Sequence, residues 1–278
     1  LADSAIVATQ DADHVGPAIT ALELGYDVLL EKPMAPNEAD CRAIVAAAQA
    51  SGGLFAVCHV MRYTPYTRLV REIIASGVLG DIASIQHLEP IGWWHFAHSY
   101  VRGNWRDEAS SSSLLLAKSC HDIDWMAYVM DSPIAAVSSF GSLRHFRAGQ
   151  APEGAAARCV DCSLQRSCAY SAVDIYLERP FGGPGSWPGY VLTRHDDQLP
   201  DAVAEGPYGR CVYASDNDVV DHQVVSMEFE SGATGSFTLT AFTDKADRAT
   251  RIFGSNGCLE GDGDTIRVRV AGRTERVR

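Results

Sequence analysis

The sequence lacks any hydrophobic run of about 18 residues or more, the length that a membrane-spanning helix needs. It also lacks an Arg-rich presequence and a visible export signal. Basic residues are scarce, because 23 Lys and Arg stand against 35 Asp and Glu, for a formal net charge of −12. This charge repels phosphate backbones and anionic membrane surfaces. We therefore expect neither nucleic acid nor a membrane as a partner.

A glycine-rich phosphate-binding turn is missing as well. No G-x-G-x-x-G occurs, and the Gly-Gly-Pro-Gly of residues 182–185 has the wrong spacing. The chain begins with Leu1 directly on an apolar run, without an initiator Met. These features predict that the 278 residues are part of a longer polypeptide.

Cysteines are present but do not follow the spacing of a disulfide framework. Several lie inside apolar stripes, where a thiol acts as a small hydrophobe. This usage is typical of a reducing compartment and predicts a cytoplasmic protein. The eight positions are 41, 58, 120, 159, 162, 168, 211 and 258.

The first sixty residues alternate between short apolar strands and amphipathic helices. Asn37 and Asp40 have the spacing of a helix-capping pair, and Gly25 and Gly52 follow the two helical patterns. This alternation is typical of a parallel sheet with right-handed crossovers, so residues 1–62 are expected to form the C-terminal half of a Rossmann domain. The expected elements are strand 4–9, a helix before Gly25, strand 26–30, a helix with Cys41, Ile44, Val45 and Ala48 inward, and strand 54–60.

Residues 63–278 are predicted to form an α+β domain with an open, mainly antiparallel sheet and helices on one face. The hydrophobic pattern predicts helices over 66–75 and 115–130, and a loop from the end of strand 82–88 to Arg106. Alternating residues around Ser231-Gly232 and the dipeptide Asn256-Gly257 predict two hairpins. Residues 141–210 form an irregular insert, which at this length is usually functional or part of an interface.

Glu31-Lys32-Pro33 directly follows the second apolar strand. In open α/β sheets, ligands bind beyond the carboxyl ends of the strands, and the proline restricts the backbone next to the lysine. The tripeptide therefore marks a candidate ligand crevice. The alternative is an exposed loop that carries a surface lysine.

Lys118, His121 and Trp125 lie at i, i+3 and i+7 of one predicted helix and share a face. A neighbouring cation favours the neutral imidazole, which can take a proton from a hydroxyl near pH 7. His121 is therefore a candidate acid/base residue together with Lys32, and the alternative is an ordinary packed or capping histidine. The neighbouring Asp122 and Asp124 are expected to point elsewhere, toward caps or surface partners.

Two further polar groups have open interpretations. Trp105 and Arg106 could stack on a planar ring or hold an anionic group, and they could equally brace two domains. His222, at the polar start of a long strand, could line a substrate pocket or be a solvated strand end.

Cys159-x-x-Cys162, with Cys168 close behind, has the spacing of zinc ligands. Only three thiols are local, so Cys211, His145 or another residue would have to complete a tetrahedral site. A structural zinc is one hypothesis, and plain buried or free thiols are a second. A redox pair is a third.

Five segments together resemble the glucose-fructose oxidoreductase / inositol dehydrogenase (Gfo/Idh/MocA) family. The resemblance covers the whole chain except the cysteine-bearing insert. The matching segments, in order, are Ala8-Thr9 with His14, Glu31-Lys32-Pro33, Arg62-Tyr63 with Pro65, Trp105-Arg106 and His121-Asp122-Ile123-Asp124.

The resemblance implies a Rossmann domain that binds NAD or NADP, and a second domain that holds substrate and often the interface of a homo-oligomer, a dimer or tetramer. It implies hydride transfer between nicotinamide and a hydroxyl of a sugar, inositol or related polyol. Lys32 would hold the reacting hydroxyl, and His121 would exchange its proton. The residues expected along the cofactor are Thr9, His14, Glu31, Lys32, Trp105 and Arg106, and those expected near substrate are Arg62, Tyr63, Lys118 and His222.

The chain departs from the family pattern at two points. Ala117 stands four residues before His121, where many such dehydrogenases have an Asp, so Lys118 takes over part of the site or the chemistry differs. The second departure is the absence of the glycine-rich phosphate-binding turn. A non-catalytic sugar-binding or assembly protein of the same fold is the alternative function.

Overall fold

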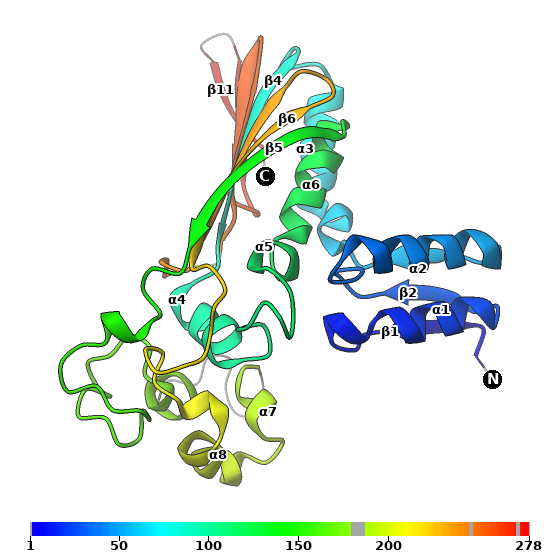
Figure 1. Ribbon diagram of the computed structural model, residues 1–278. Helices are drawn as coiled ribbons and strands as arrows, with labels where there is room; N and C mark the ends of the chain where they lie inside the picture. The colour runs from blue at the N-terminus through cyan, green and yellow to red at the C-terminus, as the bar shows by residue number, and fades with distance from the viewer. Residues whose placement is uncertain (1, 179–186, 245–246, 271–272, 278) are drawn as a thin grey trace.

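The protein, described here as a computed structural model, has two parts with separate buried cores. The structure describes residues 2–178, 187–244, 247–270 and 273–277. In Figure 1 the N-terminal part, in blue, lies beside helices that cover one face of a larger sheet, and the insert extends from the far end of that sheet.

The N-terminal part is a parallel three-stranded sheet in the order β1-β2-β3. Val7 pairs with Leu30, and both are buried together with Leu22 and Ile44 of the two helices. The parallel alternation is thus confirmed. The elements are β1 (Ser4–Val7), α1 (Val15–Glu23), β2 (Asp27–Leu30), α2 (Glu38–Ser51) and β3 (Phe55–Val57).

The helix ends follow the local signals. Asn37 is the N-cap of α2 and accepts a hydrogen bond from the Asp40 amide at 3.0 Å, as its spacing predicts. Gly52 adopts a left-handed conformation (φ 68°) directly after the helix, which glycine does at little cost. The inward stripe was wrong at one position, because Ile44 is fully buried whereas Val45 is 40% exposed.

The connection to the second part is tighter than predicted. β3 is only three residues long, and a 3₁₀ turn (Val60–Tyr63) leads into α3 (Pro65–Ala75). Thr64 caps α3, since its hydroxyl accepts a hydrogen bond from the Thr67 amide. The predicted domain boundary at residues 62/63 falls in this turn and stays a prediction.

The second part is built on an eight-stranded sheet in the order β11-β10-β9-β8-β4-β7-β6-β5. Its neighbours are antiparallel except for β4 and β7, which run parallel. The mainly antiparallel fold class and both hairpins are therefore confirmed. The strands are β4 (Ile82–Pro90), β5 (Ile134–Ser142), β6 (His222–Phe229), β7 (Thr234–Thr240), β8 (Ala249–Gly254), β9 (Gly257–Gly261), β10 (Ile266–Val270) and β11 (Arg273–Val277).

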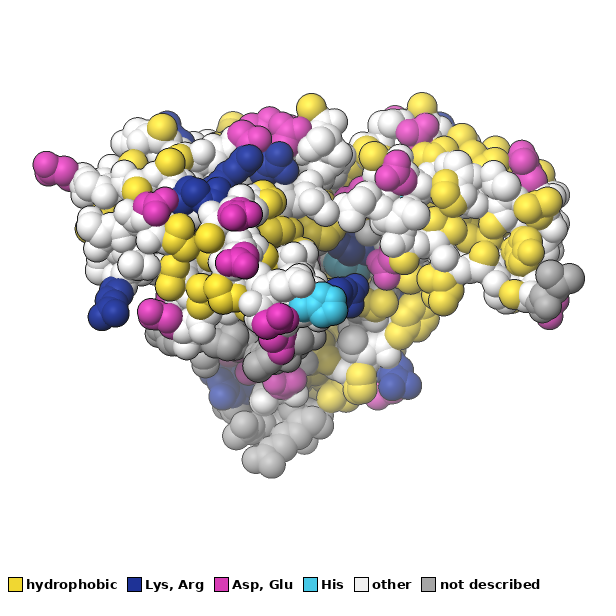
Figure 2. All heavy atoms as spheres, turned by 90° about the horizontal axis from the view of Figure 1, so that it is seen from below, with side chains coloured by type: hydrophobic (Ala, Val, Ile, Leu, Met, Phe, Trp, Pro, Cys, Tyr) yellow, Lys and Arg dark blue, Asp and Glu magenta, His cyan; other side chains and the backbone are white. Residues whose placement is uncertain are grey.

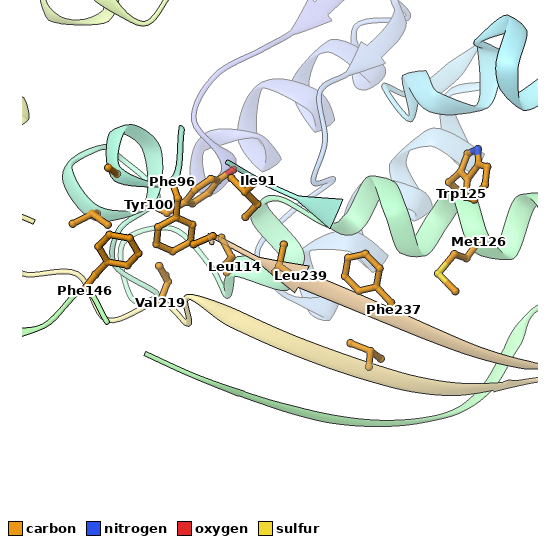
Figure 3. Packing of buried hydrophobic residues seen from close by; sticks show 14 of the residues in the cluster. Ile91, Phe96, Tyr100, Leu114, Trp125, Met126, Phe146, Val219, Phe237 and Leu239 are labelled. Carbon is orange, nitrogen blue, oxygen red and sulfur yellow. The ribbon is translucent and has the colours of Figure 1, made fainter. Parts of the chain in front are cut away.

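Helices α3 and α6 (Cys120–Met130) pack on one face of this sheet, as Figure 1 shows. Trp125 and Met126 of α6 belong to the same buried cluster as Phe237 of β7, and in Figure 3 Met126 lies on the side of the helix that faces the strands. The indole of Trp125 donates to the Thr67 hydroxyl at 2.8 Å, which satisfies its polar atom inside the core. This packing holds the first turn of α6 at a defined place beside the sheet.

Two predictions about helices between residues 93 and 130 were wrong. The stretch before Arg106 is not a loop, because α4 (Trp93–Phe96) continues into a buried π-helix (Ala97–Arg102). The expected continuous helix is instead broken into α5 (Leu114–Ala117) and α6. The break at residues 118–119 shapes the site described below.

The predicted insert begins after β5, at residue 143 rather than 141. Residues 143–171 contain one 3₁₀ turn, Ala148–Gln150, and one isolated bridge between Arg158 and Arg210. The glycine-rich stretch 182–185 lies outside the described residues. Short helical segments follow, namely a π-helix (Asp174–Glu178), α7 (Gly189–Leu192) and α8 (Leu199–Glu205). No helix in the described ranges is long and apolar enough to cross a membrane.

Candidate functional site

Lys32 links the two parts of the molecule. It follows β2, and its Nζ donates to the carbonyl of Ala117 at 3.0 Å. Ala117 ends α5, so the helix break leaves this carbonyl available to a donor from outside the helix. The predicted strand-end lysine therefore points toward the predicted histidine helix.

His121 lies in the first turn of α6, four residues after Ala117. Burial and the nearby charge of Lys32 lower the pKa of His121 to about 4, so the imidazole is neutral at pH 7. Its Nδ1 is buried and has no hydrogen-bond partner among the described residues. A capping histidine is usually hydrogen-bonded, so this unpaired nitrogen does not fit the capping alternative.

Lys118 belongs to a buried group of charges behind the helix break. Its Nζ lies 3.0 Å from Oε1 of Glu89, whose side chain is 1% exposed. The other oxygen of Glu89 lies 2.8 Å from Nε of Arg248. Lys118 is thus neutralised by a carboxylate that β4 supplies.

Arg248 extends this group to Asp122, with Nε at 2.6 Å from Oδ1. His87 Nε2 lies 3.1 Å from the same oxygen. Burial alone would raise the pKa of Asp122, but the bonds from His87 and Arg248 hold it at about 2. Asp122 is therefore ionised and held by buried partners. Its side chain is 0% exposed, so the expectation of a cap or surface partner was wrong.

Asp124 also points elsewhere, because it pairs with Arg62. Arg62 Nε donates to Asp124 Oδ2 at 2.7 Å, and its Nη2 bonds the other oxygen. The guanidinium also lies over the ring of Tyr128, 4.8 Å from its centroid. With these contacts Arg62 braces α6, and its contact with substrate stays a prediction. Tyr63 is 73% exposed.

Trp105 makes a contact between the parts that fits the bracing alternative. Its indole nitrogen donates to the Asp11 carboxylate at 3.2 Å. Asp11 is 6% exposed; burial raises its pKa, and the bond from Trp105 and the charge of Lys32 oppose that rise. Asp11 was not singled out from the sequence as a site residue. Its position just after the first strand was the available signal.

His14 holds the backbone of Pro33, next to Lys32, and of Thr9 through its two ring nitrogens. The ring is fully buried, with Nδ1 2.8 Å from the carbonyl of Pro33 and Nε2 3.3 Å from that of Thr9. A side chain without exposed surface cannot touch a bound molecule directly, so its predicted cofactor contact gains no support. The carboxylate of Glu31 accepts from the Lys32 amide at 3.1 Å. Thr9 is exposed and bonds the Asp13 carbonyl.

Two further predicted residues have ion-pair partners of their own. Arg106 pairs with Asp216, which follows the insert, with Nε at 2.8 Å from Oδ1. His222 lines a separate groove of about 830 Å³ with Arg144 and His145, and its Nδ1 lies 2.8 Å from Asp221 Oδ1. The structure does not bring His222 together with the predicted catalytic pair.

The unpredicted helical stretch carries two further histidines, which lie among aromatic rings. Burial and the charge of Lys118 lower the pKa of His95 to about 3, and burial and Arg102 lower that of His98 to about 3. The ring of Trp187 lies 4.9 Å from that of His95. The dense Trp and His content of residues 93–98 was the signal in the sequence.

The three predicted metal ligands are free thiols in the structure. Cys159 and Cys162 are buried and Cys168 is half-buried, and Cys211 lines the same small cavity. The described residues contain no group of three or more potential ligands arranged to hold a metal ion. The zinc hypothesis is therefore not supported by a preformed site.

The molecule is hollowed where its two parts meet. Figure 2 shows basic and histidine side chains inside this hollow, between a lobe rich in hydrophobic surface and the rest of the protein. A neutral imidazole and an ammonium that converge from different parts can exchange a proton with a hydroxyl and stabilise the oxyanion that results.

Comparison with protein families matches both parts. The model described as "Oxidoreductase family, NAD-binding Rossmann fold" (GFO_IDH_MocA) matches residues 1–59. The model of the family's C-terminal alpha/beta domain matches residues 71–276.

Relatives include a Bacillus subtilis (strain 168) protein named as an oxidoreductase, YteT. It is 25% identical over 273 residues, which are 93% of this chain and 60% of the relative. The 2,7-anhydro-N-acetylneuraminate hydratase of Escherichia coli (strain K12) is 30% identical over 146 residues, 52% of this chain and 38% of its own. The chain thus spans 60% or less of the length of these relatives.

Among solved structures, levoglucosan dehydrogenase in complex with NADH and L-sorbose superimposes with a TM-score of 0.67. The match covers 98% of this chain and 59% of that chain at 20% identity. At 20% identity, this similarity shows that the two proteins share a fold and nothing more.

Proposed function

Because the chain belongs to the Gfo/Idh/MocA family of oxidoreductases, we propose that it is part of an NAD(P)-dependent enzyme acting on a CH–OH group of a sugar, inositol or related polyol. The convergence of Lys32 on the helix of His121 supports this function most directly. The names of the relatives, which refer to an anhydrosugar hydratase and a levoglucosan dehydrogenase, favour a sugar-like substrate.

The residues present fit one end of a dinucleotide. The carboxyl ends of three parallel strands, the usual ligand edge of such sheets, lead to Glu31 and Lys32. Thr9, Glu31, Lys32 and Trp105 are the residues that would lie along it. The G-x-G-x-x-G turn that binds pyrophosphate is not among the 278 residues. A bound nicotinamide supplies the hydride acceptor or donor.

His121 is the proposed acid/base residue. Its neutral ring accepts the proton of the substrate hydroxyl during oxidation and returns it during reduction. The ring of His121 is only half-buried, so part of it stays accessible to that hydroxyl. Lys32 stabilises the oxyanion that develops as the proton leaves, because its ammonium is held beside the same helix.

Lys118 is proposed to contact substrate, with Glu89 holding its ammonium in place. The position four residues before His121 is Ala117, so no carboxylate on this turn can share the histidine proton. Instead of a carboxylate on this turn, the site has the ion pair between Lys118 and Glu89 of β4.

The non-catalytic alternative is not favoured by any observation. The relatives named above are enzymes, and a protein that only binds sugar has no need of a buried neutral histidine beside a lysine.

We also propose a homo-oligomer that forms through the large sheet. Phe140 of β5 and Val224 of β6 are cross-strand neighbours on its outer face, and they are 76% and 47% exposed. Exposed apolar pairs of this kind are typical of protein interfaces. Light scattering of the wild type and of Phe140→Asp tests this, because a shift of the variant toward monomer is expected.

The catalytic proposal is tested on the full-length natural protein. NAD and NADP are offered with a panel of sugars and polyols, and Lys32→Met and His121→Asn are compared with Arg42→Met, an exposed cation on α2. We expect a loss of about 10²-fold or more in kcat for both site variants, and unchanged dinucleotide affinity in His121→Asn. Full turnover in Lys32→Met would remove this lysine from the mechanism.

A further inference from the structure

The insert contains a long segment with little regular secondary structure. Residues 143–171 form one 3₁₀ turn and one isolated bridge, and Cys159 and Cys162 are among their few buried side chains. Ordering each backbone residue costs about 1–2 kcal/mol of conformational free energy, and few ladder hydrogen bonds offset that cost here. Segments of this kind are commonly held by disulfides or metal ions.

Four cysteines of this region line one cavity of about 20 Å³. The bridge between Arg158 and Arg210 places two of them, since Cys159 N donates to the Gly209 carbonyl and Cys211 N to the Ala157 carbonyl, each at 2.9 Å. In an antiparallel pair, alternate residues point to the same side, so Cys159 and Cys211 share one side of the bridge.

A tight turn brings in the next thiol. The amide of Cys162 donates to the carbonyl of Cys159 at 3.2 Å, and the amide of Cys168 donates to that of Leu164 at 2.9 Å. These turns return the chain to the same cavity, which Cys168 also lines. Two separate stretches of chain, at residues 159–168 and at 211, therefore deliver four thiols to one place.

A buried cation faces this cavity. Arg102 is 2% exposed, and its Nη2 lies 3.6 Å from Sγ of Cys159. Its Nε and Nη2 donate to the carbonyls of Arg210 and Tyr170 at 2.7 Å each, while Nη1 is buried and without a partner among the described residues.

No carboxylate in the described ranges forms an ion pair with Arg102, and the lining of the cavity contains none. A buried charge without a counterion is costly. Thiols that lose their protons to a metal ion supply such a counterion.

We propose that Cys159, Cys162, Cys168 and Cys211 bind one Zn²⁺ as four thiolates and that Arg102 stabilises the resulting anionic centre. Four protons leave to solvent as the four Zn–S bonds form, and the net charge of the zinc and its ligands becomes −2. The guanidinium of Arg102 compensates half of it and donates its unpaired N–H groups toward sulfur.

The site is structural, because four thiolates fill the tetrahedral coordination of zinc and leave no position for substrate. The described residues contain no preformed group of metal ligands. The proposed binding therefore requires the cysteine side chains to rotate toward the ion. A cavity of about 20 Å³ has room for a single ion and is too small for an iron–sulfur cluster.

The test uses the full-length protein without a histidine tag, purified under reducing conditions and supplied with Zn²⁺. Elemental analysis is expected to find about one zinc per chain in the wild type and less than a tenth of that in Cys211→Ser. Cys258→Ser is the matched control, because Cys258 is a half-buried thiol on β9 that does not line the cavity, and it keeps the full zinc content.

A second measurement does not depend on a folded variant. Wild-type protein loaded with Co²⁺ in place of Zn²⁺ is expected to show the sulfur-to-cobalt charge-transfer absorption and the intense visible bands of a tetrahedral thiolate site. A metal-free wild type that shows no such bands with Co²⁺ overturns the proposal. So does a zinc content that is equal in Cys211→Ser and the wild type, or a visible spectrum of an iron–sulfur cluster.

Discussion

Lys32 and Ala117 are 85 positions apart in the chain and are joined by a hydrogen bond of 3.0 Å from Nζ to the carbonyl oxygen. The bond connects the end of a strand in one buried core to a helix break in the other. It also places the ammonium one helical turn before His121. The predictions below test this arrangement and the charges around it.

Removal of the lysine charge is expected to change the titration of His121. Burial and Lys32 together hold the pKa of His121 at about 4, so Lys32→Met should raise it while burial keeps it below 6.5. NMR titration of the histidine ring protons measures this directly. Arg42→Met, an exposed charge change on α2, should leave the value as it is.

Acid pH is expected to destabilise the fold through three buried histidines. His95, His98 and His121 have folded pKa values of about 3, 3 and 4, below the unfolded value of about 6.5. Below pH 6.5 the unfolded chain binds more protons than the folded protein, so the free energy of unfolding falls as pH falls. The slope approaches about 4 kcal/mol per pH unit between pH 6 and 4 for three such groups.

Urea unfolding at several pH values in this window measures that slope. His121→Asn should reduce it by about a third, because one of the three groups is gone. The exposed His195 offers a matched control, since His195→Asn should leave the slope unchanged. A free energy of unfolding that is constant from pH 6.5 to 4.5 would contradict the buried neutral histidines.

Glu89→Gln is expected to destabilise the protein by about 3–5 kcal/mol. The side chain is 1% exposed and lies between the cations of Lys118 and Arg248, so the variant removes the carboxylate partner of Lys118 and leaves Arg248 with Asp122 alone. Glu38→Gln also breaks an ion pair, with Arg42, but both side chains are 77% exposed. That change should stay within about 0.5 kcal/mol, and equal effects of the two variants in chemical denaturation would argue against the buried network.

Trp105→Phe is expected to lower the free energy of unfolding by about 1–3 kcal/mol. The Asp11 carboxylate, which is only 6% exposed, loses a hydrogen-bond donor in this variant. A double-mutant cycle with Asp11→Ala isolates the pair. We expect the second substitution to cost less in the Trp105→Phe background than in the wild type. Strict additivity would show that the indole does not brace the two parts.

Local signals in the sequence predicted much of the fold. The Asn37 and Asp40 spacing identified the start of α2, and alternating polarity identified the hairpins of the large sheet. The stretch 93–102 was missed because its helical turns are stabilised by burial against aromatic neighbours such as Phe146, and no apolar periodicity marks them. Val45 was misplaced because its hydrophobic character does not record which side of the helix meets the sheet.

Only part of the candidate site was predicted, because local sequence signals mark some of its residues and not others. Lys32 and His121 stand out in short motifs, whereas Asp11 and Glu89 have nothing unusual about their neighbours in the sequence. Their roles come from partners far along the chain, Trp105 for Asp11 and Lys118 for Glu89.

The amino-acid sequence by itself determined the family, the alternation of strands and helices, and the two residues on which the proposed chemistry depends. Those features follow from neighbours a few residues apart, through periodicity, capping and backbone restriction. Only the tertiary structure decided that the ammonium of Lys32 meets a broken helix and that the guanidinium of Arg102 faces four thiols. These contacts follow from how the two cores and the insert pack, because burial changes the free energy of a charge far more than any adjacent residue does.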